Sequence, residues 1–358
     1  MTPGVLGLLG VVFLAAVGLT RVLSAPTSRW ALLDLPNERS LHAMPVPRTG
    51  GLAVFGSVFL GLALSLMLEW SGGVVSPGPA GWGGTGLWVL GITLVVGLLS
   101  FWDDQASLPV GLRLGVHAVA AGCVVWGAGL TVNVVAIPVL GDVSLGWLAP
   151  PLTMLFLVWM TNLYNFMDGM DGLAAGMTVL GYGVLGYMAW RAGHHVMMGI
   201  SLLVAMAAGG FLLFNLPPAR IFLGDVGSIP MGFLAGALAV MGVRDGVFDI
   251  WVPVLVFSPF VADATVTLFR RLLHGEKVWR AHREHYYQRL VLAGWSHRKT
   301  MLAEYLLMAV CGGTAVLYTQ AEGPARASIL VGWLLVYGAL ALGVRVVERH
   351  TRAWRAAG

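Results

Sequence analysis

Long apolar runs are the feature that most limits how this chain can fold. A helix that crosses a membrane needs about 20 consecutive, mainly apolar residues. The sequence holds eleven runs of about this length, at residues 4–23, 50–70, 84–102, 109–129, 147–166, 171–190, 195–214, 228–243, 250–270, 298–318 and 326–346. Only 11% of the 358 residues are charged, whereas a soluble domain is about one quarter charged. We therefore expect an all-α, polytopic membrane protein with about eleven transmembrane helices, in which residues 1–358 form a single integral membrane domain.

The distribution of Lys and Arg predicts the orientation of these spans. Of the 21 basic residues, 18 lie in the loops that follow odd-numbered runs, in the C-terminal tail or at the adjoining span ends, and three lie on the opposite side. By the positive-inside rule the richer side is cytoplasmic. This puts the N-terminus outside and the C-terminus in the cytoplasm. The net charge of +4 then reflects topology and not nucleic-acid binding.

A polar stretch interrupts the apolar pattern at residues 162–172. Two amides, Asn162 and Asn165, and two carboxylates, Asp168 and Asp171, lie between the fifth and sixth runs. Unpaired charge at membrane depth is costly, so such groups are rare unless they face a cavity and have a function. The plain alternative is a turn, which both Asp-Gly pairs favour. A turn does not explain the two amides just upstream, so we favour a functional site.

Four further segments on the predicted cytoplasmic side are also rich in polar groups. They are 34–51, 103–113, 215–228 and 280–289, and their charged or amide residues include Asp103, Asp104, Arg113, Asn215, Asp225, His282, Arg283 and His285. Five such segments can converge at one membrane face, which describes a site for an anionic substrate and a divalent metal. Asp and Asn oxygens suit Mg²⁺, with Mn²⁺ as the alternative ion, and Arg and His counter phosphate charge.

Several of these residues also have simpler interpretations. Asp103 and Asp104 could be a solvated cap, but they directly follow an aromatic pair at the end of a span, and adjacent carboxylates repel each other unless a cation is present. Asp225 suits a Gly-Asp turn equally well when it is considered alone. Asn215 could simply cap the end of the seventh span. The common location of these groups on one side favours a site.

The spacing of His282 and His285 suggests a zinc pair, but zinc would need further ligands. Basic neighbours favour phosphate contact instead, and an interfacial helix on anionic lipid is the plain alternative. Asp263 lies seven residues before Arg270 on one helix face, so we expect a structural ion pair between them. The remaining histidines and the two cysteines, Cys123 and Cys311, are interpreted as ordinary core or surface residues.

Taken together, these motifs resemble those of the polyprenyl-phosphate N-acetylhexosamine-1-phosphate transferases, within bacterial glycosyltransferase family 4. The resemblance runs from about residue 30 to residue 300. Its motifs are Asp34-Leu35-Pro36 with Arg39, His42 and Arg48, then Asp103-Asp104, Asn162 to Gly172, Gly224-Asp225-Val226-Gly227-Ser228, and His282 to Leu290. Each motif alone is modest, but their order, spacing and common membrane face make the resemblance specific.

The resemblance implies a reaction and a set of site residues. A HexNAc 1-phosphate would pass from a UDP-N-acetylhexosamine to undecaprenyl phosphate at the cytoplasmic face of the bacterial inner membrane, with Mg²⁺ as cofactor and UMP as product. Asn165 and Asp225 match metal positions, and Asp103, Asp104, Asp168 and Asp171 match catalytic carboxylates. The implied substrate-binding residues are Arg39, His42, Arg48, Arg113, Asn162, Asn215, His282, Arg283 and His285.

One departure from the family pattern bears on the substrate. The cell-wall phospho-N-acetylmuramoyl-pentapeptide transferase has three consecutive histidines where this chain reads His-Arg-Glu-His, so we favour the O-antigen-initiating branch, with GlcNAc or a deoxy-HexNAc such as FucNAc or QuiNAc. The alternative from another class is an ion-coupled transporter, which would spread polar groups through the bilayer depth. Scattered glycines suit packing within one chain or between chains, which leaves a homodimer open.

Overall fold

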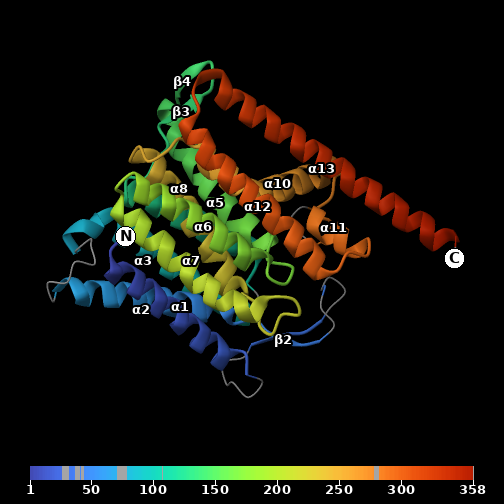
Figure 1. Ribbon diagram of the computed structural model, residues 1–358, viewed down its shortest axis with the longest axis horizontal. Helices are drawn as coiled ribbons and strands as arrows, with labels where there is room; N and C mark the ends of the chain where they lie inside the picture. Colours follow the sequence, from blue (N-terminus) through green and yellow to red (C-terminus); the bar gives the residue numbers. More distant parts are fainter. Residues whose placement is uncertain are drawn as a thin grey trace.

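In the computed structural model, residues 1–25, 32–36, 41, 44–70, 79–106, 108–277 and 282–357 are described. Within these ranges the helices are α1 (Pro3–Leu23), α2 (Gly50–Trp70), α3 (Pro79–Ala106), α4 (Val110–Gly122), α5 (Ala149–Phe166), α6 (Leu173–Arg191), α7 (His195–Asn215), α8 (Asp225–Arg244), α9 (Trp251–Val256), α10 (Ser258–Leu273), α11 (Tyr286–Leu292), α12 (His297–Gln320) and α13 (Gly323–Ala357). The four strands are β1 (Leu33–Asp34), β2 (Val46–Pro47), β3 (Val134–Ile137) and β4 (Gly141–Ser144). The chain is thus the helical, polytopic membrane protein that its apolar runs predict (Figure 1).

Nine helices of the described ranges are long and apolar enough to cross a membrane: α1, α2, α3, α4 with its π-helical extension to Gly127, α6, α7, α8, α12 and α13. The other two expected spans are helical but differ from this pattern. Helix α5 covers only 18 residues and ends in the polar Asn162–Asn165 segment. The 250–270 run is broken at Phe257 into α9 and α10, and a proline stands in the first turn of α10, where its fixed φ favours a helix start.

Helix α8 forms the centre of the bundle, although its sequence run is the shortest of the eleven. Every residue from Val226 to Gly242 is buried, and α8 packs against α2, α3, α5, α6 and α7. A helix that is apolar on all faces is typical of such a buried position. Small residues permit the close approach: a Cβ atom on Gly232 would lie 2.5 Å from the Met160 carbonyl oxygen and 2.6 Å from the Tyr164 Cβ.

The two small sheets lie at opposite ends of the helix bundle (Figure 1). Strands β3 and β4 pair antiparallel with Val134 opposite Ser144 and form a hairpin. It is tied to the bundle by Trp251, whose Nε1 donates to the Ala136 carbonyl at 2.6 Å. At the other end β1 pairs with β2, beside the loops that carry most of the predicted site residues.

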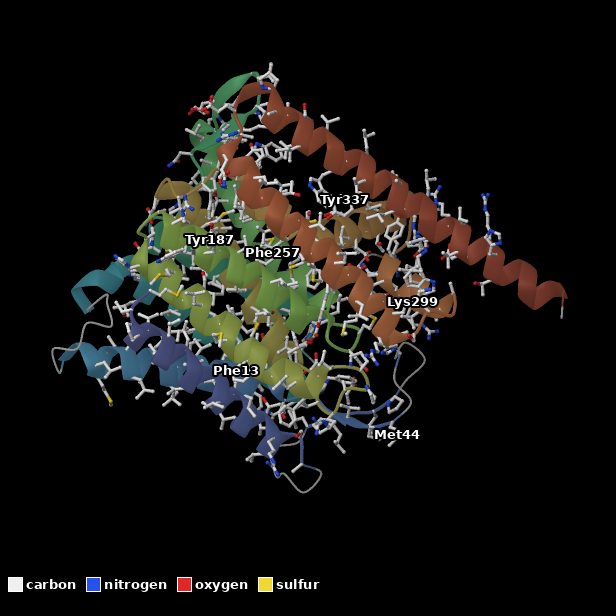
Figure 2. The ribbon with its side chains drawn as sticks, viewed as in Figure 1. Phe13, Met44, Tyr187, Phe257, Lys299 and Tyr337 are labelled. Carbon is white, nitrogen blue, oxygen red and sulfur yellow. The ribbon has the colours of Figure 1, made fainter. Side chains whose placement is uncertain are left out.

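Helices α12 and α13 cover one side of the bundle, and α13 diverges from it toward the C-terminus (Figure 1). Only 11% of the most apolar window of α13 is buried. Tyr337 nevertheless points from α13 toward the bundle (Figure 2), where its hydroxyl donates to Ser258 Oγ at 2.7 Å. The Cys311 thiol lies 3.4 Å from the same hydroxyl. Cys311 and Cys123 are both free, as the sequence predicts.

The packing of α8 generates a stability prediction. Gly232→Ala should lower the thermal unfolding midpoint by several degrees, because the added methyl meets the backbone of α5, and overpacking of this kind costs about 1–3 kcal/mol. Gly91→Ala is the matched control, since a Cβ atom at Gly91 in α3 has nothing within 4 Å. Fluorescence-detected unfolding in detergent measures both. Equal midpoints for the two variants would contradict the close α5–α8 contact.

Candidate active site

Four carboxylates from three segments meet at the first turn of α8. Asp103 and Asp104 end α3, Asp168 lies in the turn after α5, and Asp225 is the first residue of α8. Asp103 and Asp225 share one cation, because Arg113 Nη1 lies 3.2 Å from Asp103 Oδ2 and 3.8 Å from Asp225 Oδ2. The structure therefore brings together four of the carboxylates that the sequence singles out, and we call this group the carboxylate cluster.

The two adjacent aspartates have different partners. Asp103 Oδ1 accepts a hydrogen bond from the Leu108 backbone N–H at 2.7 Å, which fixes the loop that leads to Arg113. Asp104 Oδ2 accepts from the Val226 N–H at 3.2 Å, and its Oδ1 lies 3.4 Å from Arg48 Nη1. Asp104 thus joins α3 to the N-terminus of α8, where backbone N–H groups and the helix dipole favour negative charge.

Asn165 holds Asp225 from the opposite side. Its Nδ2 donates to Asp225 Oδ1 at 2.8 Å and to Ser228 Oγ at 3.1 Å. Ser228 in turn donates to the Gly224 carbonyl at 3.2 Å. These contacts place the Asn165 amide group, whose oxygen is a hard ligand, next to the Asp225 carboxylate through its nitrogen.

Glycines make the connection between the β2 segment and the start of α8. Gly50 N–H donates to the Phe222 carbonyl at 2.9 Å, and Gly51 N–H donates to the Leu223 carbonyl at 2.8 Å. Gly224 has a φ of +74°, and a side chain there would collide with the Arg48 carbonyl, so glycine is required at this position. The close approach brings Arg48 onto Asp104.

The electrostatics of the cluster depend on burial and on neighbouring like charges. Burial, followed by the charges of Asp225 and Asp104, raises the pKa of Asp168 well above its ordinary value, although the Gly224 N–H opposes this by donating to the carboxylate. When all four carboxylates are ionised, Arg48 and Arg113 leave two negative charges, which a divalent cation would balance. Among the described residues no group of three or more His, Cys, Asp or Glu side chains is arranged to hold a metal ion by itself. This donor set suits Mg²⁺, which takes few protein ligands and keeps waters and substrate phosphates.

Three of the predicted site residues in the same loops face other partners. Asp171 Oδ2 accepts from the Ala219 N–H at 3.1 Å and lies 3.3 Å from His297 Nδ1. Asn215 accepts from the Gly172 N–H at 3.0 Å and donates to the Ile221 carbonyl at 2.8 Å. Asn162 donates to the Val158 carbonyl at 2.7 Å. Asp171 and Asn215 therefore brace loops around the cluster, whereas Asn162 bonds within α5 and lies 3.3 Å from His117 Nδ1 on α4.

The first turn of α11 lies against the turn that carries Asp168. Residues 282–285 lead into α11, and we call them the basic loop. The Tyr287 hydroxyl donates to the Phe166 carbonyl at 3.2 Å. His282 stands 4.8 Å from His285 between ring centroids, and burial, then His285 and Arg271, lower the pKa of His282 to about 4, so its ring is neutral near pH 7. Arg283 has no hydrogen bond or ion pair with any described residue. Arg39 and His42 lie outside the described residues.

The expected ion pair between Asp263 and Arg270 is wrong. Arg270 Nη2 instead lies 2.8 Å from Glu284 Oε2, and Asp263 Oδ1 lies 3.1 Å from His285 Nδ1. His194 also has a partner that the sequence did not reveal, because its Nε2 lies 2.9 Å from Asp245 Oδ2. The sequence does not reveal these pairs, because the two residues of each pair come from different segments of the chain.

The sequence alone assigns no individual site role to three residues near the site: Ser228, Asp263 and His297. Ser228 lies in a recognised motif, one turn after Asp225, and this spacing was the available signal. Asp263 is a carboxylate inside an apolar run, which is itself a sign of function. His297 starts α12 and has no local signal, because its contact with Asp171 arises only when the two loops meet.

Comparisons with known proteins identify similar sequences. Residues 87–243 match glycosyl transferase family 4. Similar proteins include a probable undecaprenyl-phosphate N-acetylglucosaminyl 1-phosphate transferase of Bacillus subtilis, 32% identical over 81% of this chain and 78% of the relative. A decaprenyl-phosphate N-acetylglucosaminephosphotransferase of Mycobacterium tuberculosis is 29% identical over 91% and 85%. A phospho-N-acetylmuramoyl-pentapeptide-transferase of Moorella thermoacetica is 35% identical over 61% and 66%.

The hydrogen bonds of Asn215 predict a structural effect. Asn215→Ala should destabilise the protein by about 1–3 kcal/mol, because the buried Gly172 N–H and Ile221 carbonyl both lose their partner. Asn133→Ala, at an exposed hairpin position, is the control and should leave the midpoint unchanged. Thermal unfolding of the purified variants provides the measurement. An Asn215→Ala protein as stable as the control would show that neither bond matters.

Proposed function

Because the chain belongs to glycosyl transferase family 4, the family of the polyprenyl-phosphate N-acetylhexosamine-1-phosphate transferases, we propose that it transfers a HexNAc 1-phosphate from a UDP-sugar to undecaprenyl phosphate. The observation that carries the proposal is the carboxylate cluster beside Arg48 and Arg113 at one end of the bundle. The names of the Bacillus and Mycobacterium relatives make GlcNAc 1-phosphate the first candidate. The product would initiate O-antigen or another cell-envelope glycan.

In this proposal Asn165 and Asp225 hold a Mg²⁺ ion, with Mn²⁺ as the alternative. The clustering of carboxylates and the contact of the Asn165 amide group with the Asp225 carboxylate support this role. When bound, the ion supplies neutralisation of the diphosphate charge. Arg113 lies beside both Asp103 and Asp225 and can counter the same charge from the protein side.

The acceptor needs little activation. A phosphate monoester has a second pKa near ~6, so its oxygen is largely deprotonated at neutral pH. That oxygen would attack the β-phosphorus of the UDP-sugar in line; a new P–O bond forms, the bond from the β-phosphorus to the bridging oxygen breaks, and UMP departs with the electron pair. Asp103 and Asp104 would orient the lipid phosphate.

A single displacement agrees with the surroundings of Asp104. Its two oxygens are already engaged by the Val226 N–H and by Arg48, and such contacts lower the nucleophilicity of a carboxylate. A double displacement through an aspartyl phosphate would instead require one of these oxygens to attack. Trapping a phosphorylated Asp103 or Asp104 during turnover would overturn the single-displacement version.

The proposed location follows from charge. Most Lys and Arg lie on the side that carries the carboxylate cluster, so we place the site and the C-terminus in the cytoplasm and the N-terminus outside the bacterial inner membrane. Both substrates fit this location, because a UDP-sugar is a cytoplasmic nucleotide and the lipid acceptor reaches the site from the bilayer. Accessibility of single introduced cysteines to an impermeant reagent tests the orientation.

The reaction is tested by UMP release from a panel of UDP-sugars with undecaprenyl phosphate and Mg²⁺. We expect release with UDP-GlcNAc or another UDP-HexNAc. The Moorella relative makes the cell-wall pentapeptide transferase the second candidate, and release only with UDP-MurNAc-pentapeptide would establish it. No UMP from any donor, together with ion flux in proteoliposomes, would favour the transporter alternative.

The metal assignment predicts the behaviour of Asp225→Asn. This variant keeps the shape of the side chain but removes the charge, so transfer should fall about 100-fold or more while the protein stays folded. Millimolar Mg²⁺ should raise the unfolding midpoint of the wild-type protein, because a ligand stabilises the state that binds it, and Asp225→Asn should lose this shift. Asp142→Asn, at the exposed hairpin, should keep both. Near-normal transfer by Asp225→Asn across Mg²⁺ concentrations would refute the assignment.

The basic loop predicts a separate effect on the sugar nucleotide. Arg283 is free of other described partners, so Arg283→Ala should raise the KM for the UDP-sugar more than the KM for the lipid. Arg298→Ala, at an exposed position at the start of α12, removes the same charge away from this loop and serves as the control. Steady-state kinetics with each substrate varied in turn provides the comparison. An unchanged KM for the UDP-sugar would remove Arg283 from this role.

A further inference from the structure

The most extensively bonded carboxylate near the basic loop is Asp263, on α10. It is buried, and its Oδ1 accepts hydrogen bonds from Thr267 Oγ1 at 3.1 Å and from the Tyr286 N–H at 2.9 Å, beside the His285 ring at 3.1 Å. Its Oδ2 accepts from the Tyr287 N–H at 3.2 Å. One carboxylate from α10 therefore fixes both the His285 ring and the first backbone N–H groups of α11.

The contact with Asp263 determines which nitrogen of His285 is available. Nδ1 faces Asp263, whereas Nε2 has no hydrogen bond with any described residue. When one ring nitrogen is held by a carboxylate, that bond sets the tautomer and the orientation of the other nitrogen. The ring is also held between Phe166 and Tyr287, with interplanar angles of 24° and 12°. His285 is consequently fixed in one orientation.

The same anchor is linked to the carboxylate cluster through Tyr287. This side chain is fully buried, and its hydroxyl donates to the Phe166 carbonyl at 3.2 Å. A side chain at Gly169 would collide with that hydroxyl, so the turn carrying Asp168 lies directly on α11. A shift of α11 would therefore move both the basic loop and the turn that carries Asp168.

A purely structural role for Asp263 is the plainer interpretation. Helix α11 has a local cap of its own, however, because Gln288 Oε1 accepts from the His285 N–H at 3.3 Å. Capping alone would not require a carboxylate that reaches from another helix and also contacts the imidazole. A capping role does not explain the contact between the Asp263 carboxylate and the His285 ring.

We propose that Asp263 is a positioning residue for the sugar nucleotide. It holds His285 so that Nε2 faces the donor's phosphate groups, to which the protonated imidazolium ring can donate its Nε2–H, and it holds α11 against the Phe166–Gly169 turn. This inference rests on the proposed function, because it assigns the donor to the basic loop. It assigns Asp263 no contact with the substrate and no part in bond formation.

The test compares Asp263→Asn with a matched control. Asp249→Asn removes a carboxylate with similar contacts, because Asp249 accepts from the Trp251 N–H at 3.0 Å and lies 3.4 Å from Arg326. Asp249 lies beside α9, away from the cluster. Asp263→Asn should weaken UDP-sugar binding and raise its KM about 10- to 100-fold, with kcat changed far less. Asp249→Asn should leave both constants unchanged.

Two further variants separate positioning from folding. Asp263→Glu keeps the charge, so it should recover part of the lost affinity and keep the inference testable if Asp263→Asn does not fold. In a His285→Ala background, Asp263→Asn should add little to the KM, because partners acting through one interaction are not additive. Equal effects of Asp263→Asn with and without His285 would overturn the role assigned here.

Direct binding of the UDP-sugar to the full-length protein by calorimetry distinguishes the two levels of the proposal. If the wild-type protein binds no UDP-sugar, the proposed function fails. If it binds and the folded Asp263→Asn protein binds equally well, the function stands and the positioning role of Asp263 is wrong.

Discussion

Helix α8 is buried on every side, and its first residue, Asp225, lies among the other carboxylates at the end of the bundle. The rest of the structure depends on this burial. Because α8 contacts α2, α3 and α5, the segment before α2 and the segments that end α3 and follow α5 meet at its first turn. Glycines at the contacts permit the approach, and the backbone N–H of Val226 gives Asp104 a fixed partner. The position of the site thus follows from the packing of one helix.

The same packing creates an electrostatic conflict that the proposed chemistry would relieve. Burial and neighbouring carboxylates raise the pKa of Asp168, and two arginines neutralise only part of the charge. A site of this kind is costly when empty of cations and favourable when a divalent ion and an anionic diphosphate enter together. The basic loop completes the site from another side of the bundle, with Asp263 and Tyr287 joining it to the turn that carries Asp168.

The sequence correctly distinguished the polar loops from the apolar runs. It did not show which partner each residue of one loop contacts. Asp168 and Asp171 lie three residues apart, yet Asp168 faces the carboxylate cluster whereas Asp171 contacts Ala219 and His297. The reason is that the chain leaves helical geometry after Phe166 and turns at Gly172, which has a φ of +75°. Spacing rules for a helix therefore do not hold across this turn.

We could predict the membrane-spanning helices, the polar segments between them and the family from the sequence, because apolar length and motif order can be recognised along the chain. The tertiary structure alone decided which helix occupies the centre and which partner each charge takes. The run at 228–243 is short, yet α8 is the most buried helix, since burial depends on what packs around it. Asp263 contacts His285 and not Arg270, because the basic side chain nearest to it in space comes from the segment that leads into α11.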